Sequence, residues 1–224
     1  AYGKTTDLTA MGGAQYVHTF DKCFFMPSDL TAGLEYNRDR LKDNMWGYDR
    51  HTDQTVNIYS AFLQNEWKND RWGILIGGRL DKHNMVDNVI FSPRANLRFN
   101  PTQNINLRLS YSSGFRAPQA FDEDMHIENV GGTVAMIERA KNLKEEKSQS
   151  FSASADMYHR FGVFQTNFLI EGFYTRLTDV FVLGEPYDRG DGILVKTRSN
   201  GPGAKVMGLT LEGKVAYLSI LQIQ

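Results

Sequence analysis

Residues 105–147 constrain the fold of this chain more than any other stretch. They begin with a strict two-residue alternation, Ile105, Leu107, Leu109 and Tyr111 against Asn106, Arg108, Ser110 and Ser112. That period belongs to a β-strand with one apolar and one polar face. The strand leads into a polar segment that opens with Gly114-Phe115-Arg116-Ala117-Pro118, and alternation resumes after Lys147. Strands joined by long loops at one end and short turns at the other are typical of an outer-membrane β-barrel.

The composition excludes some classes of protein but does not choose between a soluble all-β domain and a membrane barrel. The 224 residues suffice for one large all-β domain, and 25 Lys and Arg against 26 Asp and Glu give no support for nucleic-acid binding. A mean hydropathy of -0.43 is also what the alternating faces of a barrel strand average to. The sequence has no apolar run long enough for a transmembrane helix, and its single cysteine, Cys23, cannot form an internal disulfide.

The same alternation predicts about ten antiparallel strands whose connections are alternately short and long. The predicted strands are residues 7–20, 29–43, 54–68, 72–82, 93–100, 105–112, 149–159, 164–182, 193–199 and 204–217. The most regular pair is the hairpin over 93–112, which turns at Pro101–Asn104. Residues 133–143 are predicted to form a turn or two of helix inside the long loop.

Alternation is equally compatible with a soluble β-sandwich, but three features favour a membrane barrel. Strands such as 54–68 and 164–182 exceed the usual length, and the polar faces carry Arg and Asn. Aromatic residues also flank the short turns, as expected at bilayer interfaces: Trp67, Trp72, Tyr158, Phe161 and Phe164. A sandwich would instead bury Leu97, Phe99, Leu107 and Leu109 under a second sheet.

Four ordered motifs over residues 57–213 add a resemblance. Tyr111–Pro118 (YSSGFRAP) followed by Asn142–Ser148 (NLKEEKS) resembles the TonB-dependent outer-membrane receptors, which show "GFRAP", a long surface loop and "NLKPE(K/R)S". Glu145 stands where that family usually has Pro. Tyr59–Trp67 with Gly77–Asp81, and Asn200–Glu212, are similar to two further family strands. The segment 115–126 looks most like receptors of the Bacteroidetes type.

The resemblance implies an all-β, up-and-down barrel of about 22 strands around a plug. Residues 1–224 would then be a partial barrel domain, with the plug absent and both ends truncated. The implied function is TonB-energised uptake of a scarce nutrient across the bacterial outer membrane, with iron-siderophore, cobalamin and oligosaccharide all open as ligands. The expected partners are the nutrient, outer-membrane lipid and, through the missing plug, the TonB complex. Open strand edges predict that the isolated fragment self-associates.

Ligand specificity is expected in the loops 44–53, 116–147 and 184–192, because loops on a rigid scaffold carry recognition. The candidate ligand-binding residues are Trp46, Tyr48, Arg116, Asp122, Glu123 and His126. The acidic cluster around Asp122 suits a metal or metal chelate or simply a solvated loop. Arg116 either pairs with a carboxylate at the barrel rim or contacts an anionic ligand. His51 and His83 are expected to be solvent-exposed.

No catalytic residue, metal site or cofactor is predicted. The sequence has neither GxSxG nor HExxH, and an outer-membrane protease would need a residue constellation that is not visible. Two functional alternatives to the receptor stay open. One is a passive outer-membrane porin, and the other is a soluble β-sandwich that binds carbohydrate or another ligand.

Overall fold

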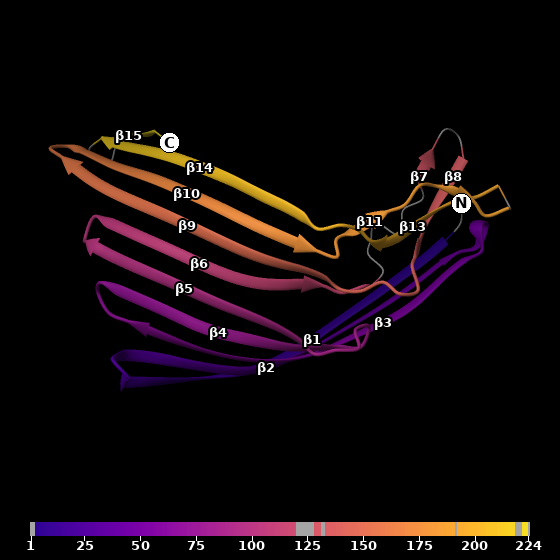
Figure 1. Ribbon diagram of the computed structural model, residues 1–224, viewed down its shortest axis with the longest axis horizontal. Helices are drawn as coiled ribbons and strands as arrows, with labels where there is room; N and C mark the ends of the chain where they lie inside the picture. The colour runs from indigo at the N-terminus through magenta and orange to yellow at the C-terminus, as the bar shows by residue number, and fades with distance from the viewer. Residues whose placement is uncertain (1–2, 120–127, 131–132, 191, 218–220, 224) are drawn as a thin grey trace.

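The chain forms one long, curved antiparallel sheet, seen in a computed structural model that describes residues 3–119, 128–130, 133–190, 192–217 and 221–223. Ten strands lie in the order β1-β2-β3-β4-β5-β6-β9-β10-β14-β15, and neighbours along the sheet are hydrogen-bonded. Figure 1 shows them running side by side along the length of the molecule. The predicted all-β, up-and-down architecture is confirmed. No helix in the described part of the chain is long and apolar enough to cross a bilayer.

The wall strands are long, as a tilted barrel strand requires. Their bounds are β1 Gly3–Cys23, β2 Met26–Met45, β3 Arg50–Lys68, β4 Trp72–His83, β5 Ile90–Thr102, β6 Ile105–Arg116, β9 Glu146–Phe161, β10 Phe164–Thr178, β14 Ala204–Tyr217 and β15 Leu221–Ile223. A single 3-10 turn, η1 Trp46–Tyr48, joins β2 to β3. The strands extend past most of the predicted ends, most of all in β1.

A second, smaller sheet lies at one end of the wall (Figure 1). It contains β7 Glu128–Val130, β8 Thr133–Arg139, β11 Phe181–Leu183, β12 Tyr187–Asp188 and β13 Leu194–Asn200. The prediction of helix over 133–143 is wrong, because β8 pairs in parallel with β13 instead. Residues 193–199 also belong to this sheet and not to the wall, and the predicted strand 164–182 divides at Asp179.

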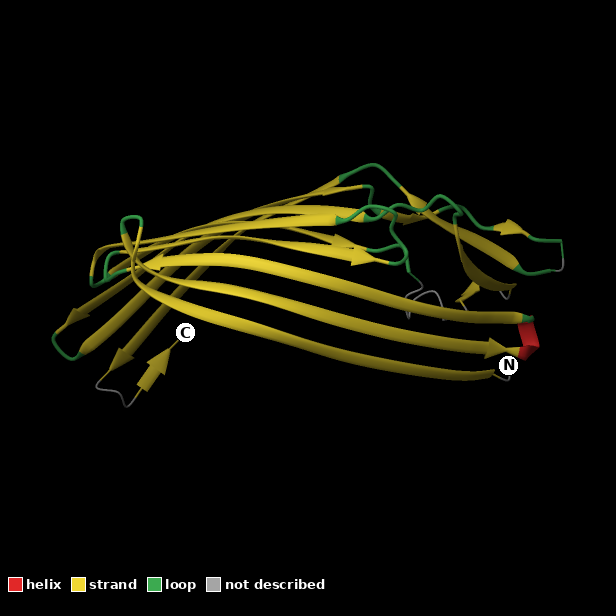
Figure 2. Cartoon of the chain, turned by 90° about the horizontal axis from the view of Figure 1, so that it is seen from below, coloured by secondary structure: helices red, strands yellow, loops and turns green. Residues whose placement is uncertain are grey.

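Short and long connections separate to opposite ends of the wall, as Figure 2 shows. Two residues, Phe24 and Phe25, join β1 to β2, and Gly162 and Val163 join β9 to β10. Gly162 has a φ of +59°, which a tight turn requires and glycine adopts without strain. At the other end, 117–145 and 179–203 form the long connections and contain the small sheet. This asymmetry is the predicted barrel rhythm.

The two faces of the sheet differ in chemistry. Cross-strand partners point to the same side, and one row across six strands reads Ile74, Leu97, Leu109, Ala153, Gly172 and Leu209. The neighbouring row on the other side reads Arg98, Arg108, Ser154, Glu171 and Thr210. We call these sides the outer and the inner face.

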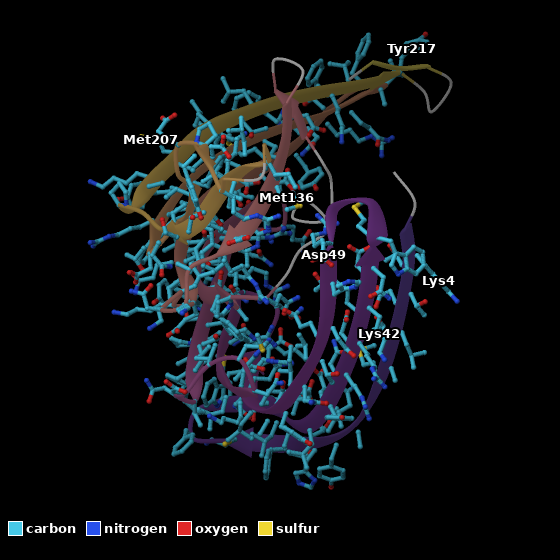
Figure 3. The ribbon with its side chains drawn as sticks, turned by 90° about the vertical axis from the view of Figure 1, so that its right-hand side faces the viewer. Lys4, Lys42, Asp49, Met136, Met207 and Tyr217 are labelled. Atoms are coloured by element: carbon cyan, nitrogen blue, oxygen red, sulfur yellow. The ribbon has the colours of Figure 1, made fainter. Side chains whose placement is uncertain are left out.

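The outer face is uncovered. Leu109 is 55% exposed and Leu209 is 66% exposed, and no second layer of the described chain lies on them. The β-sandwich alternative is therefore excluded, because it requires exactly these side chains to be buried. Figure 3, looking at the end that carries the long loops, shows the sheet curving as an open trough with β1 and β14 at its two sides.

Aromatic pairs mark two levels on the outer face. Near the short turns, Trp72 stacks on Phe99 with ring centres 4.2 Å apart, and Phe164 contacts Tyr217. Further along the strands, Tyr36 contacts Tyr59 at 4.9 Å and Tyr111 contacts Phe151 at 4.8 Å. Apolar residues fill the space between these levels. An apolar band between two aromatic girdles is the surface of a membrane β-barrel.

Candidate ligand-binding mouth

The three loops predicted to carry specificity meet at the loop end of the wall. They line one cavity of about 620 Å³, which we call the mouth pocket. Its walls are Asp49–Thr52, Pro118 with residues 136–141 and 143, and Arg189. Figure 3 labels two of these lining residues, Asp49 after the turn η1 and Met136 on β8, at the loop end of the wall. A larger hollow on the apolar outer face, lined by residues such as Ile76 and Leu209, belongs to the wall surface.

Arg50 is fixed at the base of the pocket by a buried carboxylate. Its Nη2 donates to Oδ2 of Asp43 at 2.8 Å, and the Asp43 side chain is only 2% exposed. The Thr5 hydroxyl donates to the other oxygen of Asp43 at 2.6 Å. Three strands, β1 to β3, therefore hold this guanidinium in place, because both oxygens of Asp43 are engaged.

Arg139 ties the small sheet to the wall. It is the last residue of β8, and its Nη1 donates to Oε1 of Gln54 on β3 at 2.8 Å and to the backbone oxygen of Pro118 at 3.0 Å. Underneath, Met136 pairs with Val195 of β13, and these side chains are 3% and 0% exposed. The apolar pair and the polar anchor together position the roof of the pocket.

The described lining of the mouth pocket is basic. Arg50, Arg139, Lys141 and Arg189 face two carboxylates, Asp49 and Glu138. Arg189 lies 3.8 Å from Glu138, while Lys141 is exposed. A concave site with excess cationic side chains favours an anionic ligand. Sequence reasoning did not single out these four residues, although each lies at or next to a loop that it did identify.

Arg116 lies at the end of β6, at the rim of the wall. Its cross-strand partner is Glu146 on β9, and its guanidinium carbon is 5.7 Å from the centre of the Phe181 ring. Oε2 of Glu146 accepts a hydrogen bond from the backbone N–H of Phe181 at 2.9 Å. Arg116 thus lies across from a carboxylate at the rim of the wall.

The other predicted ligand-binding residues do not line the mouth pocket within the described part of the chain. Trp46 lies in η1 and is 52% exposed, next to the pocket lining but not part of it. Tyr48 is in the same turn, and its side chain lies outside the described part of the structure. Asp122, Glu123 and His126 lie outside the described residues. Within the described ranges, no three His, Cys, Asp or Glu side chains group as metal ligands.

The two histidines have opposite environments. The side chain of His51 is 54% exposed, as predicted. His83 is completely buried, so the prediction of an exposed loop residue is wrong. It ends β4, where its Nδ1 accepts from the backbone N–H of Met85 at 3.0 Å and its Nε2 lies 3.3 Å from Gln119 Oε1. His83 thus holds the segment after β6 against the wall.

Glu145, the departure from the family motif, makes an ion pair at the start of β9. Its Oε1 lies 3.0 Å from Nζ of Lys147. Burial alone would raise the pKa of the Glu145 carboxyl, but a hydrogen bond from its own backbone N–H and the Lys147 ammonium hold that pKa below its usual range. The carboxylate is therefore charged when the loop packs.

An uncovered apolar band, a polar inner face and loops gathered at one end define a segment of membrane β-barrel wall. The model of the family described as "TonB dependent receptor-like, beta-barrel" matches residues 2–222. The chain belongs to this family, which confirms the resemblance seen in its motifs. No curated protein matched the chain by sequence.

Solved structures share the fold at low sequence identity. The siderophore receptor PirA from Pseudomonas aeruginosa superposes with a TM-score of 0.74 at 17% identity, covering 95% of this chain and 40% of that one. The ferric enterobactin receptor PfeA of the same organism gives 0.69 at 20%, covering 95% and 33%. The Serratia marcescens hemophore receptor HasR gives 0.75 at 13%, covering 96% and 40%. The chain thus spans well under half the length of these receptors.

Proposed function

We propose that this chain forms part of the wall and the ligand-gathering mouth of an outer-membrane receptor that imports an anionic ferric chelate, either a siderophore complex or heme. The observation that carries the proposal is the basic mouth pocket, in which three loops far apart in sequence present Arg50, Arg139, Lys141 and Arg189. The similar solved structures also support it, because they are a siderophore receptor, a ferric enterobactin receptor and a hemophore receptor.

The basic residues of the mouth pocket fall into two groups with different roles. Arg50 is paired with Asp43, so it shapes the pocket, whereas Arg139 donates to the uncharged Gln54 side chain and the Pro118 oxygen and also supplies positive potential. Lys141 and Arg189 lie on the small sheet and its loops, where they reach a ligand first. Transport would then need energy from the TonB complex, delivered through a plug inside the complete barrel. The polar inner face, with Arg98, Arg108 and Glu171, suits a hydrated or plugged lumen.

Binding by the purified full-length receptor tests the pocket. The double variant Lys141→Gln with Arg189→Gln is expected to weaken binding of an anionic ferric siderophore about tenfold, mainly at low salt. Lys22→Gln is the matched control, because Lys22 is an exposed cation at the opposite end of the wall. Equal affinity of the double variant and the control would overturn the assignment of the mouth pocket.

Uptake by whole cells separates the receptor from a passive porin. A receptor predicts saturable uptake of the chelate that stops when the inner-membrane proton gradient is collapsed. A porin predicts uptake that rises linearly with concentration and survives that treatment. Growth of a strain whose other iron receptors are deleted, supplied in turn with ferric siderophore, heme and cobalamin, then identifies the ligand class.

A further inference from the structure

The outer face of β2 changes chemistry abruptly along its length. Reading every second residue from the short-turn end, it presents Leu30, Ala32, Leu34 and Tyr36, and then Arg38, Arg40 and Lys42. The three cations are exposed, whereas the alternate residues Leu41 and Asp43 are buried on the inner face. A strand face that changes from apolar to cationic along its length passes from a hydrocarbon environment into an aqueous one.

The switch occurs at the upper aromatic level. Tyr36 contacts Tyr59 across the β2–β3 pair, and Arg38 faces Asn57 one row further toward the loops. Amphipathic aromatic rings sit at the headgroup level of a bilayer. Arg38, Arg40 and Lys42 therefore stand beside and above the headgroups, on the side of the long loops. Figure 3 shows Lys42 on this flank of the trough.

The same level is cationic at the far side of the wall. On β10 and β14, Tyr174 faces Met207, and the next outer row pairs Arg176 directly with Lys205. Both cations are exposed. Like charges directly opposite each other on one sheet face destabilise the pair. Two clusters on well-separated strands thus place positive charge at the same level of the wall. We call these five residues the basic collar: Arg38, Arg40, Lys42, Arg176 and Lys205.

Protein carboxylates neutralise little of the basic collar. Asp53 lies 3.2 Å from Lys42 and 3.8 Å from Arg40. Within the described residues, no hydrogen bond or ion pair engages Arg38, Arg176 or Lys205. The carboxylates Glu35 and Asp39 of β2 and Glu171 of β10 face inward, away from the collar. Arg38, Arg176 and Lys205 are therefore available to a partner outside the protein.

We propose that the basic collar binds the phosphate groups of lipid headgroups in the leaflet on the loop side. This inference rests on the proposed membrane location. Arginine pairs with phosphate through two parallel N–H···O bonds, and the aliphatic stems of Arg and Lys can lie along the upper edge of the apolar band. Phosphate oxygens between Arg176 and Lys205 remove the repulsion between them, because each cation gains an anionic neighbour.

The test uses a purified full-length receptor and detergent micelles carrying either diphosphorylated lipid A or the same lipid with its phosphates removed. Two variants reduce the collar, Arg38→Gln with Arg40→Gln and Lys42→Gln, and Arg176→Gln with Lys205→Gln. The matched control is Arg94→Gln with Arg108→Gln, which removes two cations from the inner face of neighbouring strands. Heat-modifiable migration on gels confirms that each barrel is folded.

We expect the wild type and the control to bind the phosphorylated lipid about tenfold more tightly than the dephosphorylated one, and each collar variant to lose most of that preference. Collar variants that keep the full preference, or a wild type without any preference, overturn the inference. Chelate binding is measured on the same samples. If the chelate binds but the lipid preference is missing, the lipid inference is wrong and the proposed receptor function is unaffected. If the lipid preference is present but the chelate does not bind, only the assignment of the mouth pocket is wrong.

Discussion

The guanidinium carbon of Arg116 lies 5.7 Å from the centre of the Phe181 ring, at the rim where β6 and β10 leave the wall. Glu146, the cross-strand partner of Arg116, accepts the backbone N–H of Phe181. These two contacts fasten the start of β11 to the barrel. The long connection after β10 is thereby held near the mouth, so Arg116 acts on the pocket through another element.

Arg116→Ala should loosen this rim without unfolding the wall, because a cation–π contact of a half-buried arginine is worth about 0.5–2 kcal/mol. Faster hydrogen exchange is expected at residues 181–183, measured by mass spectrometry on the receptor. Arg116→Lys should retain part of the protection. Loss of ligand binding with unchanged exchange at 181–183 would contradict the structural role and favour direct contact with the ligand.

A polar network on the inner face should stabilise β2 to β4. The Arg79 guanidinium lies 2.6 Å from Glu35 and 2.8 Å from both Asp81 and the Ser60 hydroxyl, and Ser60 donates to Asp81. Arg79→Gln is expected to lower the free energy of unfolding by about 1–2 kcal/mol, a value reduced because Arg79 is partly exposed. Urea titration of the folded barrel measures this. Arg94→Gln, which removes no hydrogen bond or ion pair among the described residues, should change this free energy by less than about 0.5 kcal/mol.

Two glycines of β14 should respond differently to the same substitution. A Cβ on Gly208 would lie 2.5 Å from Cε1 of Phe173, whereas a Cβ on Gly213 would meet nothing within 4 Å. Gly208→Ala should therefore destabilise the barrel by about 1–3 kcal/mol. Gly213→Ala should be neutral or slightly stabilising, because alanine restricts the unfolded chain. Equal unfolding midpoints in urea would show that the Phe173 ring moves aside freely.

Acid should weaken the Glu145–Lys147 pair. The folded-state pKa of Glu145 is lowered, so its stabilising contribution is present above the unfolded-state pKa of about 4.3 and is lost as pH falls through the folded-state value. The protection of amides 145–147 against hydrogen exchange, relative to the intrinsic rate at each pH, should fall between neutral pH and about pH 3. Glu145→Gln should remove this acid response, and an unaltered response in that variant would disprove the pair's role.

The open edge of the sheet predicts association of the isolated chain. β1 has 21 residues and pairs only with β2 among the described strands, so one side of its backbone offers hydrogen-bonding groups to another strand. Light scattering of the 224-residue chain in detergent should show dimers or larger species whose fraction rises with concentration. A monomer at all concentrations would contradict this prediction.

The wall could be predicted from the sequence because each of its long strands shows a two-residue alternation of apolar and polar side chains. Leu30, Ala32, Leu34 and Tyr36 stand at every second position in the sequence, and they form the outer face of β2. The predicted strand 29–43 stops two residues before β2 ends at Met45. Between Tyr36 and Met45 the only apolar residue is Leu41, so the hydrophobic period marks this part of the strand weakly although its ladder with β3 continues.

The small sheet could not be predicted locally. Residues 138–141, Glu-Arg-Ala-Lys, have helical propensity, yet β8 is a strand because Met136 and Val195 are buried against each other across a parallel pairing. The convergence of the three loops follows from the strand order. The roles of Arg50 and Arg139 do not, because they depend on how β8 docks against Gln54 and Pro118.

The length of β2 beyond Tyr36 has a consequence for how a ligand is met. Nine further residues, through Met45, rise roughly 25–30 Å at the spacing of a tilted strand. The entrance is thus held well outside the bilayer by hydrogen-bonded backbone, not by pliable loops alone. In the proposed receptor, a ligand would therefore be bound in water at the rim of a rigid funnel before it moves down into the membrane.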